Sequence, residues 1–300
     1  MRYVACINLL VVIRNGEGNR RSQRRAEMTN APENYLLAGG AAELERLQLQ
    51  ARVWEPDAEA MLDRIGLQPG WHCLDLGCGA LGIVEPLSRR VGANGRVLGV
   101  DIDPKLLTAA RAFVQEAGLT NVEILEHDAY NTTLPRASFD FVHVRFLFAP
   151  VGRDDHLLRE MLALTRPGGL VAIQEPDANS WNCFPLHPAW ERLKDAILTA
   201  FTRGGGDFNA GQRTYGMLRQ AGLEDVQLRA AVLALQNGHP YMRLPIQFAT
   251  SLRQRIIDAG LLSEADLDET IAACEQIAQD PEAYVLTFVV TQVWGRKPQS

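Results

Sequence analysis

The sequence lacks the cysteine and histidine patterns of a disulfide-bonded or metal-binding protein. Its 300 residues include five cysteines, an odd number, and no Cys-x-x-Cys pair, so we expect neither a disulfide framework nor a zinc knuckle. None of the six histidines has the spacing of a metal site, and no His-Glu-x-x-His sequence is present. We therefore predict no metal. A cytoplasmic location fits free thiols best, because the cytoplasm is reducing.

The sequence also lacks an excess of positive charge. Lysine and arginine number 30 against 36 aspartates and glutamates, which gives a net charge of -6. A nucleic-acid-binding protein usually carries a clustered basic face. We therefore predict no nucleic-acid partner.

No apolar run reaches the length of about 20 residues that a membrane-spanning helix needs. Residues 3–13 are almost wholly apolar, but the run is short and no small-residue cleavage site follows it, so no membrane partner is predicted. Residues 1–27 carry six arginines and two glutamates. We interpret this segment as a disordered extension, or as translation upstream of a start at Met28. The alternative is a weak membrane or targeting tail.

What the sequence does contain is the stretch WHCLDLGCGALG over residues 71–82. An apolar run with Asp75 inside it leads into glycines at 77, 79 and 82, and a helix-compatible segment follows. This pattern predicts a strand, a tight turn that needs glycine for positive φ, and a helix. The spacing satisfies Gly-x-Gly-x-x-Gly, which leaves open a nicotinamide or flavin cofactor and S-adenosylmethionine.

Helical and strand patterns alternate after this turn. Such alternation predicts a doubly wound α/β fold with a parallel sheet that is covered on both faces. We expect strands at 96–101, 122–125, 139–148, 170–177, 226–235 and 284–294, and helices at 82–91, 104–118, 154–165 and 215–222. Asp103 and Pro104 have the residue types of a helix N-cap and first turn, and Ser263 has the spacing to Asp266 of a capping pattern.

Acidic residues follow two of the expected strands. Asp101 ends the second strand, where a carboxylate can accept hydrogen bonds from a ribose diol. Asp128 follows the third strand. Two plainer roles stay open, because Asp101 could cap the neighbouring helix and Asp128 could serve a turn.

Five motifs between residues 70 and 177 resemble, in order and spacing, those of the class I S-adenosylmethionine-dependent methyltransferases. They are DLGCGALG, GVDIDP at 99–104, Asp128-Ala129, LPRASFD at 134–140 and RPGG at 166–169. The stretch YLLAGGAAELERLQLQ resembles the lid of bacterial small-molecule members of this class. The resemblance implies a mostly parallel seven-stranded, Rossmann-like sheet with an antiparallel last strand, an N-terminal helical lid and helical insertions.

The resemblance also implies which residues bind S-adenosylmethionine at its methionine end. Gly77, Cys78 and Gly79 would form the turn beneath this part of the cofactor. Asp75 would orient the turn and the amino group of the cofactor. Arg145, at the end of the fourth strand, lies where such enzymes close around the sulfonium.

At the adenosine end, the resemblance implies that Asp101 would bind the ribose hydroxyls and that Ile102 would cover a face of the adenine. Asp128 would accept from the adenine amino group, and the Ala129 amide would serve a ring nitrogen. The family usually has glycine at the place of Leu81, and we therefore assign Leu81 no contact.

The domain organisation follows from the position of these motifs. We expect a helical lid at 28–66, with Tyr35, Arg46 and Gln50 as candidate ligand contacts, and a methyltransferase domain at 67–300. Glu43 and Arg46 have i, i+3 spacing and are expected to pair. Insertions at about 178–212 and 238–283 carry aromatic residues that could either form the core or wall a substrate cavity, and the first insertion offers Trp181, Phe184, Trp190 and Phe201 as candidate wall residues. The lid could equally be only a packed amphipathic segment.

The candidate catalytic residues are His143, within the fourth strand, and Glu175, near the carboxyl end of the fifth. Both could instead be structural. The favoured function is transfer of a methyl group from S-adenosylmethionine, which becomes S-adenosylhomocysteine, to an oxygen, nitrogen or carbon of a small organic acceptor. The alternatives are an NAD(P)-dependent oxidoreductase, a protein or RNA methyltransferase and an inactive cofactor-binding regulatory protein. A homodimer is compatible with all of these.

Overall fold

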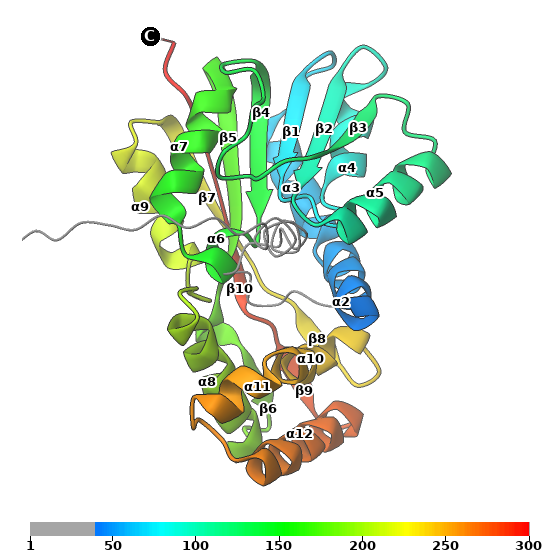
Figure 1. Ribbon diagram of the computed structural model, residues 1–300, viewed down its shortest axis with the longest axis vertical. Helices are drawn as coiled ribbons and strands as arrows, with labels where there is room; N and C mark the ends of the chain where they lie inside the picture. Colours follow the sequence, from blue (N-terminus) through cyan, green and yellow to red (C-terminus); the bar gives the residue numbers. More distant parts are fainter. Residues whose placement is uncertain (1–39, 300) are drawn as a thin grey trace, which may run out of the picture.

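The computed structural model describes residues 40–299 of the chain (Figure 1). The extension expected at residues 1–27 and the candidate lid contact Tyr35 lie outside this range. Within it, no helix combines the length and apolar character needed to cross a membrane.

A seven-stranded sheet forms the centre of the upper part of the molecule, with strand order β3-β2-β1-β4-β5-β10-β7 (Figure 1). β1, β2, β3, β4 and β5 pair in parallel, and β10 is antiparallel to both of its neighbours. The expected doubly wound, mostly parallel sheet with an antiparallel last strand is confirmed. Its strands are β1 (His72–Leu76), β2 (Arg96–Asp101), β3 (Val122–Glu126), β4 (Phe139–Arg145), β5 (Thr165–Asp177), β7 (Glu224–Ala231) and β10 (Val289–Arg296).

Helices cover both faces of this sheet, because successive residues of each strand point to opposite sides. Cys73 belongs to the core beneath α3 (Glu55–Ile65), α4 (Val84–Val91) and α5 (Pro104–Glu116). Its neighbour Leu74 belongs to the core beneath α6 (Phe148–Val151), α7 (Asp154–Leu164) and α9 (Gly211–Gln220). The strands therefore read as nearly continuous apolar runs, and polar residues inside them are exceptions that need partners.

The two predicted helix caps are confirmed. The Asp103 side chain accepts from the Lys105 amide at 2.8 Å, and Pro104 occupies the first turn of α5. Ser263 Oγ accepts from the Asp266 amide at 3.1 Å at the start of α12 (Glu264–Gln279). These side chains satisfy backbone donors that the helix itself leaves unpaired.

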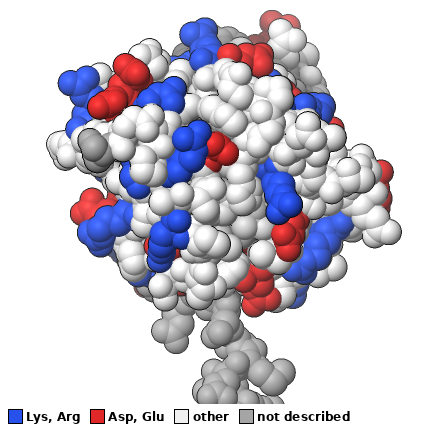
Figure 2. Space-filling view, turned by 90° about the horizontal axis from the view of Figure 1, so that it is seen from above, with Lys and Arg blue, Asp and Glu red and all other residues white. Residues whose placement is uncertain are grey.

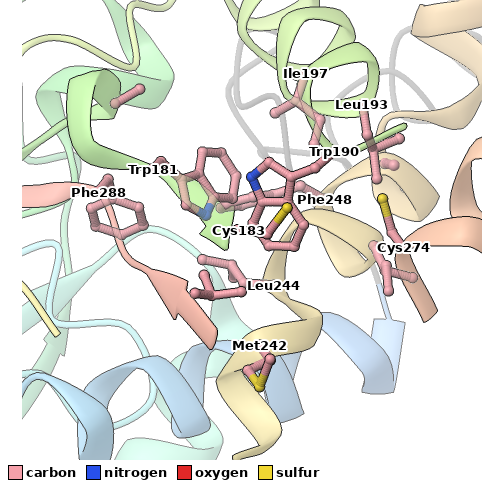
Figure 3. Packing of buried hydrophobic residues seen from close by; sticks show 14 of the residues in the cluster. Trp181, Cys183, Trp190, Leu193, Ile197, Met242, Leu244, Phe248, Cys274 and Phe288 are labelled. Atoms are coloured by element: carbon pink, nitrogen blue, oxygen red, sulfur yellow. The ribbon is translucent and has the colours of Figure 1, made fainter. Parts of the chain in front are cut away.

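Below the sheet lies a second body, which we call the helical lobe (Figure 1). Its core consists of large aromatic and aliphatic side chains that pack on one another, including Trp181, Trp190 and Phe248 (Figure 3). The lobe contains α8 (Pro188–Arg203), α10 (Leu244–Ser251), α11 (Arg253–Asp258), α12 and a small sheet of β6 (Asn182–Phe184), β9 (Tyr284–Leu286) and β8 (Ala234–Gln236). Two 3-10 turns, Ala178–Ser180 and Pro240–Arg243, join its parts.

Two expected strands are divided between the large and the small sheet. The predicted strand 226–235 is split into β7 and β8, and the predicted strand 284–294 into β9 and β10. At the crossing, the Thr287 amide donates to the Leu233 carbonyl and the Leu233 amide donates to Thr287 Oγ1, both at 2.9 Å. Both chain segments therefore leave one sheet and enter the other at the same level.

The fourth strand is shorter than predicted, since β4 ends at Arg145 rather than at residue 148. Phe146 has a φ of 57°, which breaks the strand conformation. α6 begins two residues later at Phe148. The remaining described helix, α2 (Gly40–Val53), precedes α3 and lies beside the boundary between the sheet and the helical lobe (Figure 1).

Candidate active site

A cavity lies between the carboxyl edge of the parallel strands and the helical lobe. It sits beside β1 and β4, where the strand order reverses and where open α/β sheets commonly bind ligands. Its lining includes all nine residues expected to bind the cofactor and the described lid residues Arg46 and Gln50. The nine are Asp75, Gly77, Cys78, Gly79, Asp101, Ile102, Asp128, Ala129 and Arg145.

The glycine turn forms the floor of this cavity. Gly77, Gly79 and Gly82 have φ values of 68°, 57° and 53°, a region that side chains disfavour. A Cβ on Gly82 would overlap the Asp75 carboxylate and lie 3.0 Å from the Cys78 carbonyl oxygen. A Cβ on Gly79 would meet nothing within 4 Å. The turn therefore leaves open space above Gly79 at the position where a ligand would lie.

Asp75 holds this turn in place from inside the first strand. Its Oδ2 accepts from the Ile83 amide at 2.9 Å, and its Oδ1 lies 2.7 Å from His143 Nδ1. The side chain is only 2% exposed. A buried carboxylate is thus fixed between the start of α4 and the neighbouring strand.

Asp101 ties the second strand to the same turn. Its carboxylate accepts from the amides of Gly79 at 2.9 Å, Ile102 at 2.8 Å and Asp103 at 3.0 Å. Burial raises the pKa of Asp101, and the three amide hydrogen bonds oppose that rise. The cap of the following helix is Asp103 rather than Asp101.

Asp128 has one oxygen engaged and one available. Its Oδ1 accepts from the Tyr130 amide at 2.9 Å, which is the turn role left open by the sequence. No hydrogen bond to Oδ2 forms within residues 40–299. The carboxylate can therefore serve its turn and still accept from a ligand.

Arg145 places a buried cation beside the glycine turn. Its Nη2 donates to the Gly82 carbonyl at 3.1 Å, while Nη1 is buried and has no hydrogen-bond partner in the described part of the chain. Burial lowers the pKa of this guanidinium. Because buried donors are normally paired, an oxygen of a bound ligand would complete this site.

The side of the cavity formed by α2 is polar and buried. Arg46 pairs with Glu43, as predicted, with hydrogen bonds of 2.9 and 2.6 Å, and it donates to Gln50 at 2.8 Å. Its guanidinium lies 4.9 Å from the ring centre of Phe248, on α10. This contact joins α2 to the helical lobe across the cavity.

The two catalytic candidates lie elsewhere. His143 and Glu175 are fully buried and are not among the residues that line the cavity. The Glu175 carboxylate accepts from the amides of Leu147, Phe148 and Ala149 at 2.7, 2.9 and 3.0 Å. Its contacts are those of an anchor for the segment that follows β4.

Sequence reasoning missed most of the far wall of the cavity. The candidate wall residues Trp181 and Trp190 are instead buried in the core of the helical lobe (Figure 3). The residues that do form the wall are Phe146, Phe201, Phe208, Phe248 and Phe288, of which only Phe201 had been considered. These phenylalanines come from four parts of the chain that are at least 40 residues apart, so no local pattern in the sequence could bring them together.

No group of three or more histidine, cysteine, aspartate or glutamate side chains suitable for a metal ion occurs within residues 40–299. The groups that line the cavity are carboxylates, the unpaired Nη1 of Arg145 and aromatic side chains. This set can bind an adenosine and an amino acid, and it can enclose an apolar second ligand.

Comparison with known proteins shows similarity to methyltransferases. Residues 73–169 match a family described as a methyltransferase domain. The ubiquinone/menaquinone biosynthesis C-methyltransferase UbiE of Vibrio vulnificus is 27% identical over 224 residues, which cover 69% of this chain and 82% of the relative. A demethylmenaquinone methyltransferase of Listeria monocytogenes is 28% identical over 179 residues, which cover 59% of this chain and 73% of the relative.

Solved structures share the fold. The YcgJ protein from Bacillus subtilis superposes with a TM-score of 0.54 at 17% identity, covering 81% of this chain and 99% of that one. A phosphoethanolamine N-methyltransferase 2 of Haemonchus contortus, solved with phosphomonomethylethanolamine and S-adenosylhomocysteine, gives a TM-score of 0.51 at 18% identity. That match covers 81% of this chain and 53% of the other.

Proposed function

Since this chain is a class I S-adenosylmethionine-dependent methyltransferase, we propose that its cavity binds this cofactor over the glycine turn and transfers the methyl group to a small, ring-bearing organic acceptor. When bound, the cofactor supplies a methyl group on a positively charged sulfur, already activated for transfer to a nucleophile. The observation that carries the proposal is that all nine residues assigned to the cofactor line one cavity.

The residues present fit the cofactor at both ends. Asp101 and Asp128 offer carboxylate oxygens to the sugar hydroxyls and the adenine amino group, and Ile102 offers an apolar face to the ring. The open space above Gly79 admits the methionine part. The orphan Nη1 of Arg145 suits the carboxylate of that part, because it is a buried cationic donor beside the turn.

The aromatic half of the cavity supports an apolar ring as the acceptor. The phenylalanine wall comes from the helical lobe and the segment after β4, and Arg46, Arg145 and Arg153 also line the cavity. Aromatic walls favour a flat ring, and nearby guanidinium groups favour a ring that carries an acidic hydroxyl. The two relatives named for ubiquinone or menaquinone chemistry support a ring-bearing acceptor.

Neither the tyrosine nor the cysteine that lines this cavity is suited to removing a proton, which favours positioning as the source of catalysis. Burial raises the pKa of the Tyr130 hydroxyl and of the Cys78 thiol, so both stay protonated at neutral pH. An acidic acceptor hydroxyl ionises without a strong base. Alignment of the reacting groups and exclusion of water can supply about 7 to 11 kcal/mol in favourable cases.

We propose that the helices of residues 40–66, within the expected lid at 28–66, and the helical lobe together cover the acceptor. The contact of Arg46 with Phe248 supports this arrangement, since it joins the two covers. The face of the molecule seen in Figure 2 carries interspersed acidic and basic side chains without a large basic patch. This supports a small-molecule acceptor rather than a nucleic acid, and we further propose a cytoplasmic homodimer.

Two measurements test the proposed function. S-adenosylhomocysteine, but not NADH, should raise the melting temperature of the protein, and radiolabelled methyl groups should be transferred to members of a panel of phenols and hydroquinones. Stabilisation by NADH would instead support an oxidoreductase. Binding of S-adenosylhomocysteine without transfer to any acceptor would support an inactive cofactor-binding protein.

Gly79→Ala is expected to separate cofactor binding from stability. The added Cβ has room in the free protein but occupies space assigned to the cofactor. We expect at least a tenfold loss of S-adenosylhomocysteine affinity by calorimetry, with a stability loss of about 1 to 2 kcal/mol for alanine at positive φ. Gly118→Ala is the matched control, because Gly118 has a φ of 64°, also has free space and is not among the cavity residues. Equal affinity losses in both variants would contradict the placement.

A further inference from the structure

A buried chain of hydrogen bonds runs across the central sheet and ends at the cofactor turn. We call it the polar chain. From the edge strand inward, Arg229 Nη1 donates to Gln292 Oε1 at 2.6 Å, and Gln292 Nε2 donates to Gln174 Oε1 at 2.7 Å. Gln174 Nε2 then lies 2.8 Å from His143 Nε2, and His143 Nδ1 lies 2.7 Å from Asp75 Oδ1.

The polar chain crosses five neighbouring strands on a single face. The paired positions are Arg229 with Gln292 between β7 and β10, Gln292 with Gln174 between β10 and β5, and His143 with Asp75 between β4 and β1. Gln174, Gln292 and His143 are fully buried. The face is the one covered by α3, since Cys73, two residues before Asp75, packs on that side.

The direction of every bond in the polar chain is fixed from its outer end. A guanidinium has only donors, so Arg229 must meet the oxygen of Gln292. The Gln292 nitrogen also donates to the Asp57 carbonyl of α3 at 3.0 Å, which orients this amide a second time. Gln292 can then offer only a donor to Gln174, and Gln174 can offer only its nitrogen to His143.

This direction determines the protonation of the histidine. Because Gln174 donates to Nε2, that nitrogen must be the acceptor, and the ring proton must lie on Nδ1 and point to Asp75. Burial lowers the pKa of His143, which agrees with a neutral ring. Asp75 then accepts from His143 through one oxygen and from the Ile83 amide through the other.

We propose that Gln292 and Gln174 are positioning residues for the cofactor, which hold His143 as its Nδ1–H tautomer and thereby fix Asp75 beneath the glycine turn. This inference rests on the proposed function, since Asp75 matters for catalysis only if the turn binds S-adenosylmethionine. It gives His143 a role other than proton transfer to the acceptor. It also makes cofactor affinity depend on the side-chain amide of Gln292, which lies on β10, two strands away from β4.

Sheet stability alone does not require such a chain. Apolar side chains of similar size in these positions would bury more apolar surface without needing partners, and a buried polar network is costly unless every member is satisfied. Each link here is satisfied, and the series begins at a cation and ends at an anion. The direction of hydrogen bonding set by Arg229 at the edge of the sheet therefore determines the direction of every bond up to Asp75 at the ligand site.

The first test reads the proton on the histidine ring. In the wild-type protein, nitrogen NMR of ¹⁵N-histidine should show His143 with a protonated Nδ1 and an unprotonated Nε2; the signal is assigned by its loss in His143→Asn. Gln292→Glu keeps the shape and leaves the new carboxylate paired with Arg229, but it removes the donor to Gln174 and to the Asp57 carbonyl. The Gln174 side-chain amide should then rotate by about 180°, so that its nitrogen donates to the new carboxylate at position 292 and its oxygen faces His143. His143 should therefore gain a proton on Nε2.

The second test measures the consequence for the cofactor. Gln292→Glu should weaken S-adenosylhomocysteine binding by about two- to thirtyfold, the range found for changes in coupled networks. The KM for the cofactor should rise while kcat at saturation stays close to that of the wild type. Gln227→Glu, the same change at an exposed position of β7, is the matched control and should alter neither the histidine signal nor affinity. Gln174→Glu is a second variant that should place a proton on Nε2 directly.

The outcomes separate the inference from the proposed function. A wild-type ring protonated on Nε2, or a Gln292→Glu ring unchanged from the wild type, would overturn the inference. An unchanged cofactor affinity in a Gln292→Glu protein whose histidine has shifted would overturn its positioning role. A wild-type protein that shows the expected tautomer but does not bind S-adenosylhomocysteine would contradict the proposed function and leave the direction of the polar chain supported.

Discussion

Replacing Asp101 by alanine is expected to weaken S-adenosylhomocysteine binding by about a hundredfold, and by no less than tenfold. The three amides leave about one acceptor site on the Asp101 carboxylate, on Oδ2, and a hydrogen bond from a sugar hydroxyl to this charged acceptor is worth roughly 1.5 to 3 kcal/mol. The Gly79 amide would also lose its acceptor, so the glycine turn would lose a bond that holds it next to β2. Titration calorimetry measures both the affinity and its enthalpy.

Two further variants make this result interpretable. Asp140→Ala removes another partly buried carboxylate, which accepts from the His72 amide and pairs with Arg166 but does not line the cavity. It should lose stability without losing affinity. Asp101→Asn keeps one oxygen and removes the charge, and its affinity should fall between those of alanine and the wild type. Unchanged affinity in a folded Asp101→Ala protein would remove this residue from the cofactor site.

The second large effect concerns Glu175 and pH. Burial raises the pKa of this carboxyl from 4.5 to about 7, against the opposing effect of three amide hydrogen bonds. The folded protein therefore holds this proton more tightly than the unfolded chain does. The stabilisation is fully present below about pH 4.5 and is lost as the pH rises towards 7. The difference amounts to about 3 kcal/mol.

Glu175→Gln removes this titration and leaves all other groups in place. Chemical denaturation of both proteins between pH 5 and 8 should show the wild type losing stability relative to the variant until about pH 7, with little further change above it. The variant also turns an NH₂ group towards one of the three amides, which should cost about 1 kcal/mol at every pH. Parallel stability profiles would show that the amides keep this carboxylate ionised in the fold.

The cofactor half of the cavity could be found from the sequence because its residues are close together along the chain. Asp75, the three glycines and Asp101 lie within 27 positions, on two consecutive strands and the turn between them. Parallel strands bring their carboxyl ends to one edge of the sheet, so consecutive motifs must meet there. In this part of the fold, residues that are close together in the sequence are therefore also close together in space.

The catalytic candidates could not be judged in this way. The sequence places His143 and Glu175 near the correct edge, but it does not say towards which side or neighbour each side chain points. His143 is contacted by the Gln174 side chain. Glu175 accepts from three backbone amides that follow the end of β4, where Phe146 has a φ of 57°. A residue near a ligand edge can thus have all its bonding capacity used by the scaffold.

The amino-acid sequence by itself determined the alternation of strands and helices, the glycine turn, the helix caps at Asp103 and Ser263, and the set of residues around the turn. These features depend on backbone conformation and on neighbours within a few tens of positions. Only the tertiary structure decided the aromatic wall, the exchange of strands between two sheets and the polar chain from Arg229 to Asp75. Those depend on which surfaces pack together and on which buried polar atoms find partners, and both are properties of segments that lie far apart in the chain and meet only when the whole core forms.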